Sequence, residues 1–529
     1  MFSPGFFSPE PSADQSSPDG LSRALQACRQ CSRLKRKCQR ELPCCSLCVR
    51  LGKSCHYPAR RKPYGSRHSD EDQSASSTAS VVSSSSETVN PFPDAFFIDT
   101  ELFQSVTHSA LRKSTYPVPA HVSQLLGAGA SAVCEPYFST VDTWFPFISK
   151  KSLNQSIQAN NPAEASGLAL LLLCMKLVSD VTLLQNTSAV DAGPYRTAKS
   201  YASLMEDVSP ASLQVFQSLV LIALYEMGHG IFPAAYLTVG RAARLGILRG
   251  IHDRKNSTQL FQAPPTWTYW EEERRTWWAA SILERCINLG PTGLPLAIPE
   301  PAQGDLLPTR DAEWLRGEIG TTQALYTTGF LPEVNIGPFA RVCQASHILG
   351  RVINHRNCRK DAQTRDFILD EALQLSATLT ALDSYLSQPV DDGAAASTVD
   401  MALCTAARMA LYHMYACNQP DVQAPRLAEE SAMQTESIAG IKQIIGLRGA
   451  ALARCVLQQG AESLARTSPL VIQCLYDAAT ECEWFIREGD VVEGARETLQ
   501  LLMGALTLLA RRWGVADKCL RLLKILDEQ

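Results

Sequence analysis

Long apolar runs are missing from this chain of 529 residues. A membrane-spanning helix needs about 18 or more consecutive apolar residues. The richest stretch, GLALLLLCMKLV at 167–178, is shorter and contains Lys176, so we expect no membrane contact. The N-terminus has no basic stretch followed by an apolar core, and we therefore expect no secretory leader. On this basis the 18 cysteines should work as free thiols and metal ligands in a reducing compartment.

Recognisable catalytic motifs are missing as well. The sequence has no P-loop, no G-x-G-x-x-G and no G-x-S-x-G. His229, in the run GHG, and His252 stand alone, and an isolated histidine is more often a structural residue than a general base. An enzyme is therefore the least favoured of three function classes, and we predict a protein that works by binding.

Acidic residues are almost absent from one segment. Between positions 21 and 67 there are 13 Lys or Arg residues and a single acid, Glu41. The whole chain has a net charge of −4, so this segment carries +12 and the remainder carries −16. A basic module attached to an acidic body predicts that one end of the protein meets a polyanion.

Composition divides the chain into four parts. Residues 1–20 are rich in Ser, Pro and Asp and predict a disordered tail. Residues 21–62 form the basic, cysteine-rich module. Residues 63–100, with the Ser-rich run 68–90 at their centre, predict a low-complexity linker, either an inert spacer or a phosphorylated segment. Residues 101–529 show helical periodicity between Pro and Gly breaks and predict a large all-α body.

Within the body, apolar spacing predicts a series of helices. They cover residues 212–229, 234–249, 270–289, 367–387, 401–417, 431–446, 469–486 and 495–513. The segment 270–289 places Trp270, Trp277, Trp278, Ile282 and Cys286 on one stripe. We expect its three glutamates, 271–273, in the first turn, where they complement the helix dipole.

Seven cysteines lie between positions 28 and 55, and six of them form two identical triplets. Cys28, Cys31 and Cys38 have the spacing C-x2-C-x6-C, and Cys45, Cys48 and Cys55 repeat it 17 positions later. Choosing Cys44 in place of Cys45 would break the repeat, so Cys44 is the extra thiol.

The repeat predicts a metal cluster. Three thiolates cannot complete a tetrahedral zinc site, but six complete two tetrahedra if two sulfurs bridge both ions. The first cysteine of each triplet, Cys28 and Cys45, is the natural bridge by pseudo-twofold symmetry. Because the module has few large apolar residues, two zinc ions must supply most of its folding free energy.

The stretch ACRQCSRLKRKCQRELPCCSLCVRLGKSCHY resembles the fungal zinc binuclear cluster, a six-cysteine, two-zinc DNA-binding domain. Pro43, two residues before Cys45, and the glycine Gly52 also match. The resemblance implies a two-helix module in which lysines of the first triplet, here Lys35 and Lys37, read a CGG-type half-site. Ser32 and Leu34 depart from the family's basic pattern. The backbone contacts that an arginine usually makes there are therefore missing or supplied by Arg33 and Arg36.

The residue chemistry supports the same interpretation. Lys or Arg side chains can donate to guanine O6 and N7 in the major groove. Arg29, Arg33, Arg36 and Arg50 are expected to neutralise phosphates, which makes binding depend on salt. The basic runs KRK at 35–37 and ARRK at 59–62 are weak candidates for nuclear import.

The body also resembles a known region. Residues 212–310 are similar to the middle homology region that follows many fungal binuclear clusters. Glu273, Arg274, Arg275, Trp277 and Trp278 carry the similarity. We interpret the tryptophans as core and the charged residues as an ion-pair network, with contact to an inducer as the alternative.

We therefore predict a nuclear transcription factor of the RNA polymerase II type. It would bind GC-rich, CGG-like half-sites in double-stranded DNA and regulate a metabolic or secondary-metabolite pathway. Co-regulators or the general transcription machinery are the expected protein partners. No heptads follow the cluster, so the protein should either bind as a monomer or form a homodimer through the helical body. The alternative is a zinc-stapled ligand-sensing or interaction protein without sequence-specific DNA binding.

Overall fold

A computed structural model describes the chain at residues 24, 26–33, 36–57, 95–105, 116–127, 129–181, 188–210, 212–259, 264–302, 304–325, 336–358, 365–388, 396–416, 428–459, 461–489 and 492–527. The chain divides into two compact units, Met1–Glu87 and Thr88–Gln529. The predicted tail 1–20 and the Ser-rich run 68–90 lie outside the described residues. The last part of the predicted linker is helical, because α3 (Ala95–Ile98) forms there and Phe96 makes an edge contact with Phe103.

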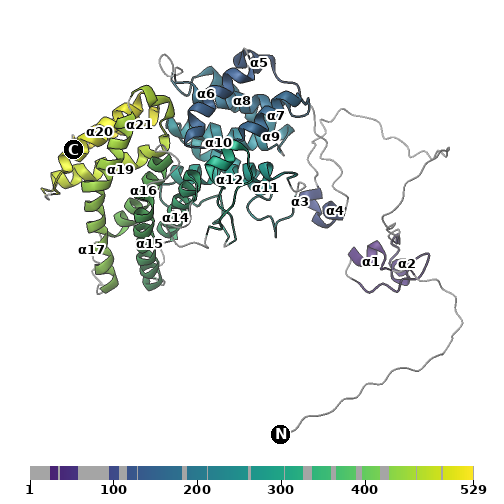
Figure 1. The fold of residues 1–529 in the computed structure, drawn as a ribbon. Helices are drawn as coiled ribbons and strands as arrows, with labels where there is room; N and C mark the ends of the chain where they lie inside the picture. The colour runs from purple at the N-terminus through teal and green to yellow at the C-terminus, as the bar shows by residue number, and fades with distance from the viewer. Residues whose placement is uncertain are drawn as a thin grey trace, which may run out of the picture. The chain divides into compact units, whose positions relative to one another are not determined.

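The larger unit is built from helices (Figure 1). Its first half contains α4 (Thr100–Ser105), α5 (Ala120–Leu126), α6 (Ala130–Ser139), η1 (Val141–Thr143), α7 (Lys150–Ala159), α8 (Ala165–Ser179), α9 (Gly193–Val208), α10 (Leu213–Gly228), α11 (Ala234–Leu248), α12 (Trp267–Ile287) and α13 (Asp311–Arg316). Its second half contains α14 (Pro338–Cys358), α15 (Arg365–Leu386), α16 (Ala396–Ala416), α17 (Ala428–Gln443), η4 (Ile444–Gly449), α18 (Ala450–Gln459), η5 (Ala461–Arg466), η6 (Pro469–Val471), α19 (Ile472–Arg487), α20 (Ala495–Ala510) and α21 (Gly514–Asp527).

In the described part of the larger unit, extended backbone pairs only at an isolated bridge between Leu306 and Ala324. The prediction of an all-α body is thus confirmed. The predicted helices 212–229 and 234–249 correspond to α10 and α11 within one residue at each end. The sequence did not predict α14, although it has 21 residues.

The hydrophobic core runs through the whole body as one cluster. The most apolar run of the sequence forms α8, which packs on α6, α9 and α10. Every side chain of α10 from Val215 to Gly228 is buried, and α10 also contacts α11 and α12. The packing continues from α12 through α14 to α16, and from there to α17 and α19. None of the described helices combines the length and the apolar character that a membrane crossing demands.

The start of α12 differs from the prediction. The helix begins at Trp267, and the hydroxyl of Thr266 caps it by accepting from the backbone N–H of Tyr269 at 3.4 Å. This cap lies one turn upstream of the predicted start at 270. The three glutamates therefore fall outside the first turn and have no dipole role there; all three are buried instead.

Two of these buried glutamates are paired with arginines. Glu271 accepts from Arg275 Nε at 2.9 Å and from Arg274, while Glu273 bridges Arg249 and Arg254. The prediction of an ion-pair network is confirmed. Of the tryptophans, Trp278 is buried and Trp277 packs against the core from a half-buried position. Trp270 lies nearer the surface, under the guanidinium of Arg254.

Arg275 joins three parts of the body. It is fully buried and donates to the carbonyl of Pro146 at 2.8 Å, to the carbonyl of Thr309 at 2.7 Å and to Asp311 Oδ1 at 2.8 Å. Its guanidinium also lies over the rings of Trp314 and Phe339. A guanidinium satisfied on every side acts as a structural tie, so the structure favours the core interpretation of this motif over contact with an inducer.

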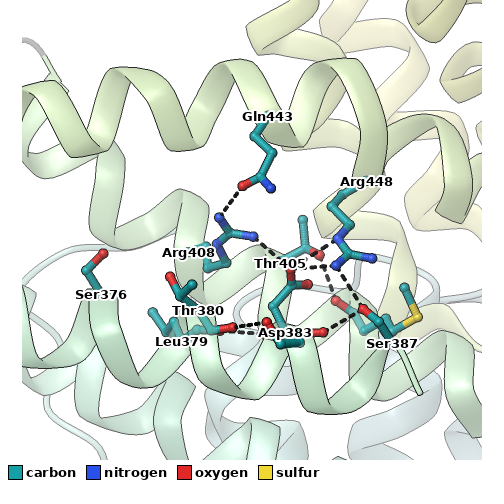
Figure 2. Close-up of polar contacts among 12 residues, drawn as sticks. Ser376, Leu379, Thr380, Asp383, Ser387, Thr405, Arg408, Gln443 and Arg448 are labelled. Carbon is teal, nitrogen blue, oxygen red and sulfur yellow. Dashed lines mark hydrogen bonds and ion pairs between the residues drawn. The ribbon is translucent and has the colours of Figure 1, made fainter.

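A second buried charge cluster joins α15, α16 and η4 (Figure 2). Asp383 Oδ2 accepts from Arg408 Nη1 at 3.2 Å and from Arg448 Nη2 at 2.7 Å. Arg408 also donates to Gln443 Oε1 at 2.8 Å, and Arg448 donates to the hydroxyl of Ser387 at 2.8 Å. The predicted helix 431–446 is interrupted here, because its last residues enter the π-helical segment η4.

The two isolated histidines of the sequence, His229 and His252, make contacts within the fold that are typical of structural residues. His229 accepts from the backbone N–H of Gly514 at 3.3 Å and lies against the rings of Tyr225 and Trp513. Burial, followed by the nearby cations, lowers the pKa of His229 to about 3. His252 contacts the hydroxyl of Ser257 at 3.0 Å.

Candidate metal centre

The smaller unit contains two short helices, α1 (Arg29–Arg33) and α2 (Ser46–Arg50), which contact each other. Each helix begins directly after the first cysteine of a triplet. Cys45 is the N-cap residue of α2, and its sulfur accepts from the backbone N–H of Cys48 at 3.5 Å. The sulfur of Cys28 accepts from the N–H of Cys31 at 3.4 Å in the same way. The C-x-x-C spacing therefore lets a sulfur serve as a helix cap.

The third cysteine accepts an equivalent hydrogen bond in each of the two triplets. The N–H of Cys28 donates to Cys38 Sγ at 3.5 Å, and the N–H of Cys45 donates to Cys55 Sγ at 3.2 Å. The backbone continues the pattern, because Arg36 N donates to Cys31 O and Lys53 N donates to Cys48 O, both at 3.0 Å. The 17-residue repeat of the sequence is thus also a repeat of local hydrogen bonding.

Four sulfurs converge between the helices. Those of Cys28, Cys31, Cys45 and Cys48 are buried and lie within 4.8 Å of one another. The distance from Cys28 to Cys45 is 3.7 Å, and the distance from Cys31 to Cys45 is 3.5 Å. Zinc–sulfur bonds of about 2.3 Å place the ligands of a tetrahedral zinc about 3.8 Å apart. The donor set and its spacing therefore fit zinc, with Cys38 and Cys55 packed against the group.

The thiols differ in how readily they ionise. Burial opposes ionisation of Cys45, but the N–H of Cys48 and hydrogen bonds from neighbouring thiols outweigh it and lower its pKa to about 6. Burial and hydrogen bonds with the other cysteines raise the pKa of Cys48 to about 12. A metal ion binds only thiolates, so zinc must displace protons from this group.

The two adjacent cysteines of the sequence have different surroundings. Cys45 is 0% exposed, whereas Cys44 is exposed to solvent. The peptide bond between Leu42 and Pro43, just before this pair, is cis. The side chain of Glu41 accepts from the N–H of Ser46 at 2.9 Å. The chain bends at residues 42–44, and only the second thiol is buried.

Sequence reasoning missed Tyr57. Its ring packs against the cysteine group, and its hydroxyl donates to the carbonyl of Glu41 at 2.6 Å. This contact ties the end of the second triplet to the turn that joins the two triplets. An aromatic residue two positions after Cys55, in a segment with few apolar side chains, was the available sign.

The basic residues of the module lie on its surface where they are described. Arg29, Arg36, Lys37 and Arg50 are exposed. Arg33 is the last residue of α1, and the placement of its side chain is outside the described part. Lys35 also lies outside the described residues. Exposed cations around a metal centre are available to a polyanion.

Two family models match the chain. Residues 26–64 match the fungal Zn(2)-Cys(6) binuclear cluster domain, and residues 135–387 match the fungal specific transcription factor domain. Transcription factor BOA15 of Botryotinia fuckeliana is 36% identical over 181 residues, which cover 34% of this chain and 98% of that protein. The chain belongs to the fungal zinc cluster transcription factors. It is a zinc-binding, DNA-binding regulator of transcription rather than an enzyme, and its cluster domain binds two zinc ions.

Other members of this family are more distant but cover more of the chain. The citrinin biosynthesis transcriptional activator mrl3 of Monascus ruber is 22% identical over 373 residues, covering 63% of this chain and 73% of that protein. The azaphilone cluster-specific transcription factor azaR of Aspergillus niger is 25% identical over 398 residues, covering 68% and 81%. No solved structure matches the chain significantly.

Proposed function

We propose that this zinc cluster factor recognises CGG-like, GC-rich half-sites in double-stranded DNA. One observation carries the proposal: two cysteine triplets with the same hydrogen-bond pattern hold four sulfurs within 4.8 Å of one another, inside a module whose described basic side chains are exposed. A folding staple alone would not require this excess of positive charge. The alternative, a ligand-sensing or interaction protein whose cluster is only a staple, predicts no preference for a DNA sequence.

The proposed zinc ligands are the six repeated cysteines: Cys28, Cys31, Cys38, Cys45, Cys48 and Cys55. Cys28 and Cys45 are the proposed bridging ligands. The distance of 3.7 Å between their sulfurs supports this assignment, because two bridging sulfurs form an edge that both tetrahedra share. The exposure of Cys44 supports its exclusion.

The proposed base-reading residues are Lys35 and Lys37, and the proposed phosphate contacts are Arg29, Arg33, Arg36 and Arg50. Base contacts determine sequence preference, whereas phosphate contacts position the protein and make its affinity depend on salt. The exposure of Lys37 and Arg50 at different places in the module supports such a division of roles.

The proposed organisation keeps the sequence boundaries: a cluster domain at 21–62, a linker at 63–100 and a regulatory body at 101–529. The nucleus is the location that this function requires. The names of the Monascus and Aspergillus relatives point to control of a secondary-metabolite pathway. We also propose that the body provides the contacts to co-regulators and any homodimer interface.

The test measures DNA binding by the zinc-loaded full chain with fluorescence anisotropy. One duplex contains a CGG half-site, and the other has the same composition with the triplet permuted. Each lost base contact costs about 1–3 kcal/mol, so we expect at least about tenfold weaker binding to the permuted duplex. Equal affinity for both duplexes over a range of salt concentrations would contradict sequence recognition and favour the staple alternative.

A further inference from the structure

A cavity of about 430 Å³ lies within the body, and all of its lining residues belong to the larger unit. Its walls come from α7, α8, α10 and the start of α12. Leu153, Leu171 and Leu213 form apolar parts of the wall, and Tyr269 contributes an aromatic side chain. Pockets of about 300–1,000 Å³ with mainly apolar walls and a few polar groups are typical of small-molecule sites.

Glu272 is the polar group that distinguishes this cavity. It is one of the three buried glutamates of α12, and the flanking Glu271 and Glu273 both pair with arginines. No ion pair among the described residues involves Glu272. Its Oε1 accepts from the backbone N–H of Ser149 and from Gln217 Nε2, both at 3.0 Å. Its Oε2 has no hydrogen-bond partner in the described part of the chain.

The unpartnered oxygen has a physical cost. Glu272 is 4% exposed, and a buried acceptor without a partner loses its water without compensation. Burial is the main cause that raises the pKa of Glu272 to about 7, and the N–H of Ser149 and the amide of Gln217 oppose the rise. The Ser152 hydroxyl also lies beside this carboxyl and opposes the rise, without reaching Oε2 in hydrogen-bond geometry.

The charges around the cavity restrict the type of ligand. Arg249 contacts the cavity, but it is bound to Glu273, which Arg254 also contacts. Glu164 adds a further carboxylate to the wall. The lining thus has three carboxyl groups and one guanidinium, so an anionic ligand would meet mainly like charge.

We propose that the Glu272 cavity binds a small, largely apolar amine, whose N–H group donates to the carboxyl group of Glu272 while its apolar part contacts the leucine and tyrosine walls. This pairing supplies the partner that Glu272, unlike its neighbours, does not have. The proposal goes beyond DNA recognition, and it is tested without DNA.

The experiment uses the zinc-loaded full chain and isothermal titration calorimetry. The probes are tryptamine and indole-3-acetate, which share a ring system that fits the cavity and differ in the sign of their charge. A hydrogen bond to a charged group contributes about 1.5–3 kcal/mol, so tryptamine should bind at least about tenfold more tightly than indole-3-acetate.

Three variants locate the site. Glu272→Gln keeps an acceptor for Ser149 and Gln217 but replaces Oε2 by an amide donor, and it should weaken tryptamine binding about tenfold. Ser156→Phe places a ring in the cavity from α7 and should remove binding of tryptamine while Glu272 itself is unchanged. Glu164→Gln removes a different carboxylate from the same cavity and should change the affinity less than about threefold.

Thermal unfolding of each variant shows that it is folded, and Ser156→Phe provides a second test if Glu272→Gln does not fold. Several results would overturn the proposal: no saturable binding of tryptamine, equal binding of both probes, or unchanged tryptamine binding in a folded Glu272→Gln or Ser156→Phe protein. Loss of DNA recognition in the duplex assay has no bearing on these outcomes.

Discussion

Replacing Cys45 by serine should empty the zinc cluster, whereas the same change at the adjacent Cys44 should leave it intact. The sulfur of Cys45 is buried and lies 3.7 Å from that of Cys28 and 3.5 Å from that of Cys31, while Cys44 is exposed. A serine hydroxyl can still accept from the N–H of Cys48 and preserve the cap of α2. It cannot ionise to replace a thiolate at neutral pH.

The expected loss of zinc affinity follows from the proposed position of Cys45 between the two zinc ions. Structural zinc binds with about 10–16 kcal/mol, which is roughly 2.5–4 kcal/mol for each of four ligands. Losing one thiolate should weaken zinc binding by roughly 100-fold. If Cys45 bridges, both ions are affected, so Cys45→Ser should release both zinc ions to a chelator that wild type resists, and lose specific DNA binding with them.

The assay counts zinc released to a colorimetric chelator from the full chain, with anisotropy on the CGG duplex measured in parallel. Wild type and Cys44→Ser should each contain two zinc ions per chain, as the cluster family does. The reasoning is refuted if Cys44→Ser loses zinc while Cys45→Ser keeps it, because the 17-residue repeat would then have selected the wrong thiol.

Three further results are expected. Lys37→Ala should reduce discrimination between the CGG and permuted duplexes. Arg50→Ala should instead weaken binding to both duplexes equally and lower the slope of log affinity against log salt concentration by about 1. Anisotropy at several salt concentrations measures both effects. Arg275→Ala should destabilise the body by about 3–5 kcal/mol in urea unfolding, because it leaves buried carboxylates uncompensated. Arg274 is partly exposed, so Arg274→Ala should reduce the stability much less. Similar losses in the two variants would contradict the central role of Arg275. Glu272 has a folded-state pKa of about 7, above its ordinary value, so its protonation stabilises the fold below about pH 4.5 and this contribution is lost as pH rises to 7. Between pH 4.5 and 8 the free energy of unfolding of Glu272→Gln should therefore rise by roughly 3 kcal/mol relative to that of wild type. Parallel curves of stability against pH for the two proteins would refute this.

The cysteine module was readable from sequence because its geometry is local. A sulfur that caps a short helix needs an N–H three residues later, and both C-x-x-C pairs provide one. The repeat spacing therefore carried most of the information about the site. The contact between Tyr57 and Glu41 spans 16 residues and has no periodic pattern, which is why it was missed.

The body was predictable as helical, but its helix boundaries and polar interior were less so. The start of α12 depends on the Thr266 cap, one turn before the apolar stripe begins. Helix α14 was missed because both of its faces are buried and many of its buried residues, such as Arg341 and His347, are polar. A helix without a clear polar face lacks the periodicity on which such predictions rest.

The segment η4 has a consequence for helical register. A π-helical turn accommodates more residues than an α-helical turn, so it rotates everything beyond it around the helix axis. Each residue of an α-helix advances by about 100°, so a one-residue change here would turn α18 and present a different side chain to α20. Arg448 lies within this segment and is fixed to Asp383 on α15. The charge cluster of Figure 2 therefore sets the rotational phase in which α18 meets its neighbours.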